Sequence, residues 1–524
     1  MLYVWLLIFA IAILIKFKNL TRLNITNIIP GYITLDDTKA KISSGLEHND
    51  LLQLMERFNY KPGEGICFGF TITWAQESVS QREGTFYERI NLIRKEKENL
   101  VAKVRRITNK IKRNQQVNYQ EEQLLEINAL IEAVCIAQSP HSYEPIYNGR
   151  ITQTNIDNIL DTAQQGLACG GAIKKLFTKT VAMASLIHVD DYFKYLSSLI
   201  HLHDNLVMIV SNEQHSIGLK RHPYGWLLLD TNYLYKQSSD YPYLLLNERQ
   251  LSSQLNNSFE ERGTLIINID FIAFDNLNLR HRLQQLNNSY PVTYQHFWYK
   301  NCRNISFMEI CVQSGDDLSI REMARLQNKR GNLLTQTQVK DALRLTVDCN
   351  QSKILAILME IRDLDINIAC QSDGKTALGL ACKLGNLPLV KLLITHPHID
   401  INRADDKVNT PLMIACKYSK QSMELITLLL QAGANLIIQN CDRKNALRIA
   451  RENDNKIAIA AIGNFNRSQR LLAAGNDNLA FLERRYGLSQ VTAYGCTFFT
   501  TRRAMYANKS IQPETSLLHI SDMM

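Results

Sequence analysis

A six-residue pattern recurs at nearly constant spacing in the C-terminal half of the chain and limits how that half can fold. Thr376 opens Thr-Ala-Leu-Gly-Leu-Ala, and Thr410 opens Thr-Pro-Leu-Met-Ile-Ala 34 positions later (410 − 376). Asn445 opens a third copy after 35 positions (445 − 410), and Asp341 stands 35 positions before the first (376 − 341). A second apolar segment follows each copy. Because one such unit cannot bury its apolar face alone, the pattern predicts stacked pairs of helices.

Motif, period and second helix together resemble ankyrin repeats, whose units are about 33 residues long. The resemblance implies an all-α ankyrin-repeat solenoid over residues 336–465 that binds a protein partner on its concave surface. The histidine of the usual Thr-Pro-Leu-His pattern is absent, so the hydrogen bond with which it orders the loop is not expected. Cys382 and Cys416 occupy the same position in two repeats, and we expect them to fill the core.

Near the other end of the chain, a loop rich in glycine runs into an apolar segment at Cys67. Residues 62–65 read Pro-Gly-Glu-Gly, and Phe70 and Trp74 follow as large apolar side chains. A thiol at the N-terminus of a helix lies at the positive end of the helix dipole, which favours the reactive thiolate. The segment therefore predicts a nucleophilic cysteine. The alternative is a buried cysteine that only packs.

A histidine and an aspartate follow downstream in a pattern typical of neighbouring strands. His215 comes after the apolar residues 206–210, and Asp230 ends residues 226–230, beyond a Pro/Gly turn. This arrangement predicts two antiparallel strands that hold an imidazole against a carboxylate. His215 lies 148 positions after Cys67 (215 − 67), in the order expected for nucleophile, base and orienting residue. His222 and Asn232 are the alternatives for the last two roles.

The residues around these positions resemble a known family of enzymes. Gly65-Ile66-Cys67 with Trp74, the isolated His215 and the segment 226–233 are similar to the YopT/AvrPphB-type cysteine proteases, papain-like enzymes that bacteria inject into host cells. The resemblance implies an α+β papain-like domain over residues 21–300. It also implies that Cys67 is the nucleophile, His215 the general base and Asp230 the residue that orients the imidazole.

Two positions depart from the pattern of that family. Thr231 stands where the family has a proline. Lys61 stands six residues before the cysteine, where a glutamine or asparagine would complete the oxyanion hole. Asn59 is the nearby side-chain candidate for that hole, and the backbone N–H of Cys67 is the expected second donor.

Residues 1–15 form one unbroken apolar run, which Lys16 and Lys18 follow. As a helix the run would be about 22 Å long, and snorkelling lysines could extend it toward the roughly 30 Å of a bilayer core. We therefore expect residues 1–20 to form an N-terminal hydrophobic helix that anchors the protein in a membrane. The positive charge on its C-terminal flank predicts that the bulk of the chain is cytosolic. The alternative is a buried core helix.

Composition narrows the classes of partner and cofactor. The net charge of +9 is modest for 524 residues, and residues 82–113, predicted as one long basic helix, lack interleaved aromatics, so no nucleic acid partner is expected. The eleven cysteines never form Cys-x-x-Cys, which excludes a disulfide framework and a zinc motif. The sequence His201-x-His203-Asp204 is more typical of a surface helix end than of a metal site. We expect no metal and no cofactor.

These features predict five segments: an anchor (1–20), a papain-like domain (21–300), a helical linker (301–335), ankyrin repeats (336–465) and a capping helix with a tail (466–524). The function expected is that of a membrane-associated, thiol-dependent acyl-transfer enzyme, first of all a cysteine protease acting on a host protein that the repeats recruit. The alternatives are a non-catalytic ankyrin adaptor and a Cys-His-Asp transferase, such as a ubiquitin-modifying enzyme. Secretion into a host cell is a further expectation.

Overall fold

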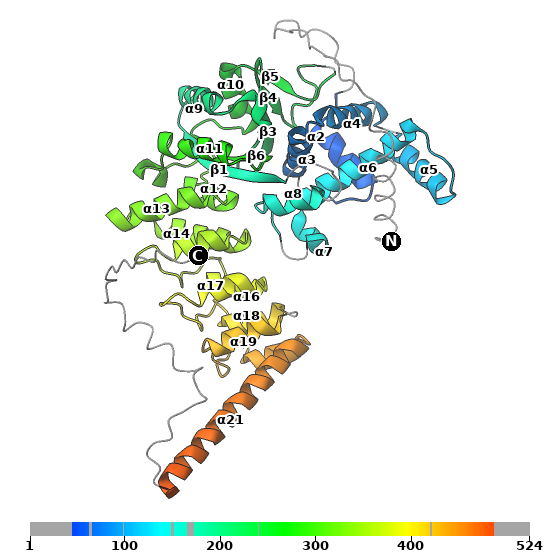
Figure 1. Ribbon diagram of the computed structural model, residues 1–524. Coiled ribbons are helices and arrows are strands. Elements are labelled where there is room, and N and C mark those ends of the chain that lie inside the picture. The colour runs from blue at the N-terminus through cyan, green and yellow to red at the C-terminus, as the bar shows by residue number, and fades with distance from the viewer. Residues whose placement is uncertain are drawn as a thin grey trace, which may run out of the picture. The chain divides into compact units, whose positions relative to one another are not determined.

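The computed structural model describes residues 45–61, 65–97, 99–147, 151–164, 172–238, 240–419 and 422–486 (Figure 1). The chain divides into two compact units at residue 459, and the first unit contains both a β-sheet and the helical repeats. The predicted anchor, residues 1–20, lies outside the described residues. Within the described ranges, every helix is too short or too polar to cross a bilayer.

An antiparallel sheet of six strands, in the order β1-β6-β2-β3-β4-β5, forms the centre of the N-terminal part. Residues 265–274 form β6, which lies between β1 and β2. The predicted turn at residues 223–225 joins β3 to β4. The strands are β1 (Ile173–Met183), β2 (Val207–Ser211), β3 (Ser216–His222), β4 (Gly225–Leu229), β5 (Leu244–Leu246) and β6 (Leu265–Phe274).

Helices cover both faces of this sheet because successive strand side chains point to opposite sides. In β2, Val207 and Ile209 join the core under α3 and α6, whereas Met208 and Val210 join the core under α9, α10 and α11 (Figure 1). The helices of the first side are α2 (His48–Arg57), α3 (Cys67–Val79), α4 (Glu83–Glu96), α5 (Leu100–Lys112), α6 (Tyr119–Gln138), α7 (Glu144–Tyr147) and α8 (Ile156–Gln164). Those of the second are α9 (Leu186–Leu199), α10 (Glu248–Ser258) and α11 (Leu277–Ser289).

The basic segment 82–113 is two helices, so the prediction of one long helix is wrong. Helix α4 ends at Glu96 and α5 begins at Leu100. Lys97, which follows α4, forms an ion pair with Asp50 of α2. Apolar residues of both helices then face the same core, and α5 packs against α6.

A stack of helices, α12 to α20, continues from the sheet into the repeats. Residues 301–335, predicted as a linker, hold α12 and α13. Helix α12 packs on β1 and β6, and the backbone N–H of Thr180 in β1 donates to the buried carboxylate of Asp316 at 2.7 Å. The helices are α12 (Phe307–Ser314), α13 (Asp317–Arg330), α14 (Gln336–Asp348), α15 (Ser352–Leu358), α16 (Ala377–Lys383), α17 (Leu387–Leu393), α18 (Pro411–Tyr418), α19 (Met423–Gln431), α20 (Ala446–Glu452) and, beyond it, α21 (Lys456–Tyr486).

The first residue of three recurring motifs caps a helix, whereas Asp341 lies inside α14. The side chains of Thr376, Thr410 and Asn445 accept hydrogen bonds from backbone N–H groups in the first turns of α16, α18 and α20. This explains why the motif opens on Thr or Asn, which satisfy donors that a helix leaves unpaired. Cys382 and Cys416 are fully buried, which confirms that they fill the core.

Candidate active site

Helix α3, which begins at Cys67, is held by close approaches at two glycines. A Cβ on Gly69 would lie 2.1 Å from the carbonyl oxygen of Val134 in α6, and one on Gly218 in β3 would lie 2.2 Å from the ring of Trp74. Only glycine allows α3 to pack this closely on both neighbours. The indole of Trp74 also donates to the hydroxyl of Tyr87 at 3.1 Å. The position of the Cys67 thiol is thus fixed by α6 on one side and the sheet on the other.

His215 lies in the turn between β2 and β3, immediately before β3 begins. The side chain of Asn212 accepts the backbone N–H of His215 at 2.9 Å and so shapes the turn. Asp230 follows the last residue of β4, the neighbouring strand. Nε2 of His215 lies 2.9 Å from Oδ1 of Asp230, and the backbone N–H of Asn232 donates to the same oxygen at 2.8 Å. The sheet therefore brings the imidazole and the carboxylate together.

The thiol of Cys67 and the imidazole of His215 interact and shift each other's protonation. Burial alone would raise the pKa of Cys67. Hydrogen bonds with His215 and His48, the charge of His215 and a hydrogen bond with Thr231 outweigh burial and lower this pKa to about 5. Burial would lower the pKa of His215, but hydrogen bonds with Asp230 and Cys67, and their charges, raise it to about 10. Between these values the site holds a thiolate and an imidazolium.

Two residues at the sulfur carried no signal in the sequence. Nδ1 of His48, the first residue of α2, lies 3.9 Å from Sγ of Cys67. The hydroxyl of Thr231 donates to Sγ at 3.5 Å and lies 3.1 Å from Nδ1 of His48. The three groups form a chain of hydrogen bonds that ends on the sulfur.

Asn59, the candidate for the oxyanion hole, does not belong to this chain of hydrogen bonds. Asn59 is exposed, with φ of 66°, beyond the C-terminal end of α2. The rise of an α-helix places it about 15 Å from His48, which opens the same helix beside the sulfur. Among the described residues no hydrogen bond joins Asn59 to Cys67. The role of Asn59 in an oxyanion hole stays a prediction, and the side chain that lies at the sulfur is His48.

The structure does not support the alternatives His222 for the base and Asn232 for the orienting residue. His222 ends β3, and His215 precedes its first residue, so the length of the strand, about 20 Å, separates them. The ring of His222 instead accepts the backbone N–H of Tyr224 at 3.3 Å. Asn232 supports Asp230 through its backbone rather than replacing it. Cys67, His215 and Asp230 are the combination that the structure assembles.

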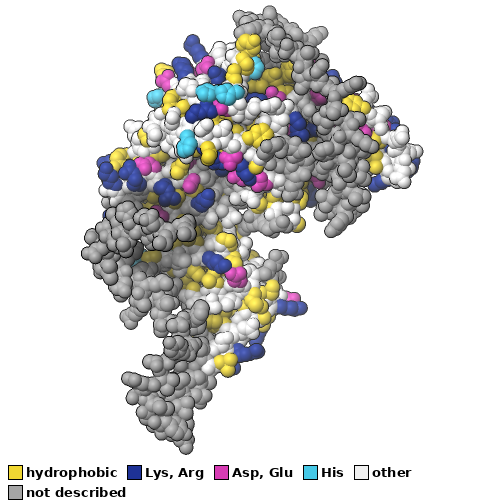
Figure 2. Space-filling model, viewed as in Figure 1, with side chains coloured by type: hydrophobic (Ala, Val, Ile, Leu, Met, Phe, Trp, Pro, Cys, Tyr) yellow, Lys and Arg dark blue, Asp and Glu magenta, His cyan; other side chains and the backbone are white. Residues whose placement is uncertain are grey.

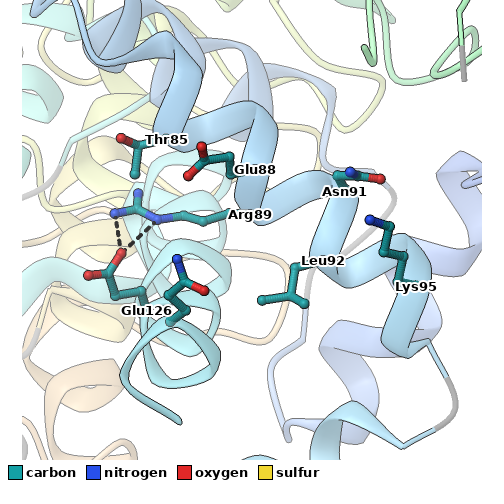
Figure 3. A pocket seen from close by; sticks show the side chains of 8 residues that line it. Thr85, Glu88, Arg89, Asn91, Leu92, Lys95 and Glu126 are labelled. Carbon is teal, nitrogen blue, oxygen red and sulfur yellow. Dashed lines mark hydrogen bonds and ion pairs between the residues drawn. The ribbon is translucent and has the colours of Figure 1, made fainter. Parts of the chain in front are cut away.

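A cavity of about 250 Å³ lies between α4 and α6, away from Cys67 (Figure 3). Arg89 crosses it and pairs with Glu126 of α6 at 2.8 Å and with Glu77 of α3 at 3.1 Å. Glu77 is ten residues along α3 from Cys67, about 15 Å by the helical rise. The cavity is an ion-paired depression between helices and does not belong to the cysteine site.

Figure 2 shows histidine side chains on the part of its face that α9 to α11 occupy in Figure 1. Among the described residues, His201, His203 and Asp204 lie near one another, with possible ligand atoms within 4.8 Å. The guanidinium of Arg282, however, donates to Nδ1 of His201 at 3.0 Å and to Asp204 at 2.6 Å. Since a cation already holds the carboxylate and one ring nitrogen, we assign no metal to this cluster.

The stacked helix pairs, with their Thr- or Asn-capped first helices, define a helical repeat array. Residues 343–440 match the family model described as ankyrin repeats (3 copies). This part of the chain therefore consists of ankyrin repeats, as the sequence pattern predicted. Each repeat stacks on its neighbours and presents an extended surface, so ankyrin arrays act in protein binding. The match lies entirely outside the sheet and the cysteine site.

Proposed function

We propose that this protein is a thiol-dependent acyl-transfer enzyme, first of all a papain-like cysteine protease, whose protein substrate is recruited by the ankyrin repeats. One observation carries the proposal. The Cys67 thiol, at the N-terminus of α3, interacts with an imidazole that is itself hydrogen-bonded to the buried carboxylate of Asp230 at 2.9 Å. A nucleophile, a base and an orienting residue in this relation are the working parts of a cysteine hydrolase.

In the proposed reaction, the Cys67 thiolate attacks the substrate carbonyl carbon and forms a C–S bond. The backbone N–H of Cys67, in the first turn of α3, stabilises the oxyanion. The His215 imidazolium gives its proton to the leaving nitrogen as the C–N bond breaks. Water then attacks the acyl-enzyme while His215 accepts its proton, and the thiolate leaves. An amine in place of water would make the enzyme a transferase, such as a ubiquitin-modifying one.

The test is labelling of the full chain with a cysteine-directed activity probe at neutral pH, read at each cysteine by peptide mass spectrometry. Selective labelling of Cys67, lost in His215→Ala, supports the enzyme. Labelling of Cys67 no faster than that of the exposed Cys441 contradicts it. A Cys67→Ser variant should lose proteolysis of a substrate captured from host lysate and keep its binding, because the repeats lie on separate helices.

The second candidate is a non-catalytic ankyrin adaptor, which the matched repeats favour because they imply protein binding without chemistry. Retention of all cellular effects by Cys67→Ser would favour this adaptor. Membrane anchoring through residues 1–20, with the bulk of the chain in the cytosol, remains part of the proposal on the apolar sequence alone. Separation of membranes from cytosol with and without residues 1–20 tests it, and an unchanged distribution contradicts it.

A further inference from the structure

The turn that carries His215 forms hydrogen bonds and an ion pair with the loop that precedes α12, at the start of the helical stack. Both carboxylate oxygens of Glu213, two residues before His215, accept hydrogen bonds from Nδ2 of Asn301, at 3.1 and 3.0 Å. Nη1 of Arg303 lies 3.3 Å from Glu213 and 3.4 Å from Glu261. We call Glu213, Glu261, Asn301 and Arg303 the clamp.

The clamp is a buried and mostly satisfied network, unlike a surface ion pair. The side chain of Glu261 is fully buried, that of Glu213 is 10% exposed and that of Arg303 22% exposed. Glu261 also accepts the backbone N–H of Cys302 at 3.1 Å. The side chain of Asn301 accepts the N–H groups of Arg303 and Ile305, which fixes its own loop. Burying a charged side chain costs free energy, which only well-placed hydrogen bonds and ion pairs offset. A buried network of this kind therefore favours one geometry of its side chains.

The clamp reaches the imidazole by two routes. The first is the turn itself, where Glu213 stands two residues before His215. The second is Phe259, whose carbonyl oxygen accepts from Nη2 of Arg303 at 3.0 Å and whose ring meets the ring of His215 edge to face, with centroids 6.1 Å apart. Arg303 therefore contacts two residues that hold His215 in place: Glu213 in the turn and Phe259 beside the imidazole ring.

From these contacts we infer that Asn301 and Arg303 are positioning residues for His215, so that the loop opening the helical stack is a working part of the cysteine site. This inference rests on the proposed function. Its consequence is that the stack that leads into the repeats does more than recruit: it sets the angle at which the imidazole meets the thiol. A displacement of about 1 Å at such a site can cost roughly a hundredfold in rate.

The experiment measures alkylation of Cys67 by iodoacetamide in the full chain over a range of pH, with Cys441 as the internal reference. Glu213→Gln keeps the shape of the side chain and removes the charge that Arg303 and Asn301 hold. We expect the rate at Cys67 near pH 6 to fall about threefold, less than in a variant without His215, and the midpoint of its pH profile to rise. Arg303→Lys, which keeps the charge and loses the planar fork, should give an intermediate shift.

The matched control is Glu322→Gln, which breaks the exposed pair with Arg325 in α13 and should leave the profile unchanged. If Glu213→Gln does not fold, Asn301→Ala, which leaves all three charges in place, is read in the same way. An unchanged midpoint in the folded variant overturns the inference while the proposed function stands. If Cys67 of the unaltered chain reacts no faster than Cys441, the proposed function fails and the inference with it.

Discussion

Gly218 of β3 lies directly beneath the indole of Trp74 of α3, so close that an added Cβ would be 2.2 Å from the ring. Neither residue touches Cys67, yet their contact decides how near the helix of the nucleophile comes to the strand that follows His215. Trp74 is fully buried and belongs to the same core as Ile209 of β2 and Leu229 of β4, the strands that flank β3. Gly218 thus allows α3 to pack closely on the strand that follows His215.

Gly218→Ala should therefore destabilise the fold by about 2–3 kcal/mol, since the ring has no room to retreat in a packed core. It should also slow alkylation of Cys67 in the fraction that stays folded, because α3 must move away from β3. Thermal unfolding and alkylation of the same sample measure both effects. Gly263→Ala, at an exposed glycine with open space around it, is the matched control. Equal behaviour of the two variants would contradict this role for Gly218.

The pH dependence should separate the thiol from the imidazole. Because the pKa of Cys67 is lowered to about 5, alkylation should stay fast above that pH and fall as the thiolate is protonated below it. Peptide cleavage also needs the His215 proton, whose pKa is raised to about 10, so cleavage should decline again as pH rises through that value. The rate of alkylation should therefore show one inflection with pH, whereas the rate of cleavage should follow a bell-shaped pH profile.

The control for that profile is His215→Ala. With an ordinary thiol pKa near 8.5, the thiolate fraction at pH 6 falls roughly 300-fold, but a more basic thiolate is about 40-fold more nucleophilic, so we expect a net loss of about tenfold in alkylation. Cleavage should vanish, because the proton donor is gone. An inflection that stays near pH 5 in this variant would show that His215 does not ionise the thiol.

Much of this arrangement could be predicted from residue patterns that local physics fixes. Apolar runs separated by a Pro/Gly turn predicted two antiparallel strands, one carrying His215 and the next ending at Asp230. The structure divides the first of these into β2 and β3 and places His215 in the turn between them. The recurring motif, its period and the apolar segment that follows it predicted the repeats. These signals depend on neighbours along the chain, which a sequence displays directly.

The rest depends on contacts between distant segments. His48 reaches the sulfur because the fold brings the first residue of α2 beside the first residue of α3, and no spacing in the sequence indicates that. Asn59 was chosen for its nearness in sequence to Cys67, and the direction of α2 leaves it away from the sulfur. Glu213 and Arg303 are 90 residues apart in the chain. The clamp exists only once β2, β3 and the loop after α11 are folded together.

His48 and Thr231 should contribute to the low pKa of Cys67 without being essential. Thr231→Val removes the hydroxyl that donates to Sγ at 3.5 Å and keeps the shape, and His48→Ala removes the imidazole 3.9 Å away. One hydrogen bond to a charged group is worth about 1–2 kcal/mol, so each variant should raise the midpoint of Cys67 alkylation by about one pH unit. His222→Ala, at the far end of β3, is the control.

The double variant of His48 and Thr231 tests whether the two act as one chain of hydrogen bonds. Since Nδ1 of His48 lies 3.1 Å from the Thr231 hydroxyl, we expect the double variant to shift the midpoint little more than either single one. Shifts that add fully would show that the two residues act on the sulfur separately. No shift in any of the three variants would remove both from the site.

Val408 offers a prediction in the repeats, because it has a backbone conformation that suits glycine. Its φ is 60°, and Gly374, the equivalent residue 34 positions earlier (408 − 374), has φ of 79°. A left-handed conformation costs an L-residue roughly 1–2 kcal/mol, and glycine returns part of that through its greater freedom in the unfolded chain. Val408→Gly should therefore stabilise the repeat by about 1 kcal/mol, since the valine side chain is 40% exposed and gives up little packing.

Native-state hydrogen exchange in α18, which follows Val408 directly, measures this gain as slower opening of that repeat. The reciprocal variant, Gly374→Val, is the matched control. It should open the preceding repeat faster, because its Cβ would lie 2.2 Å from a carboxylate oxygen of Asp406 and φ would be strained as well. Faster exchange in Val408→Gly would contradict the strain argument, because the exposed valine would then have to stabilise its loop through packing that outweighs its backbone conformation.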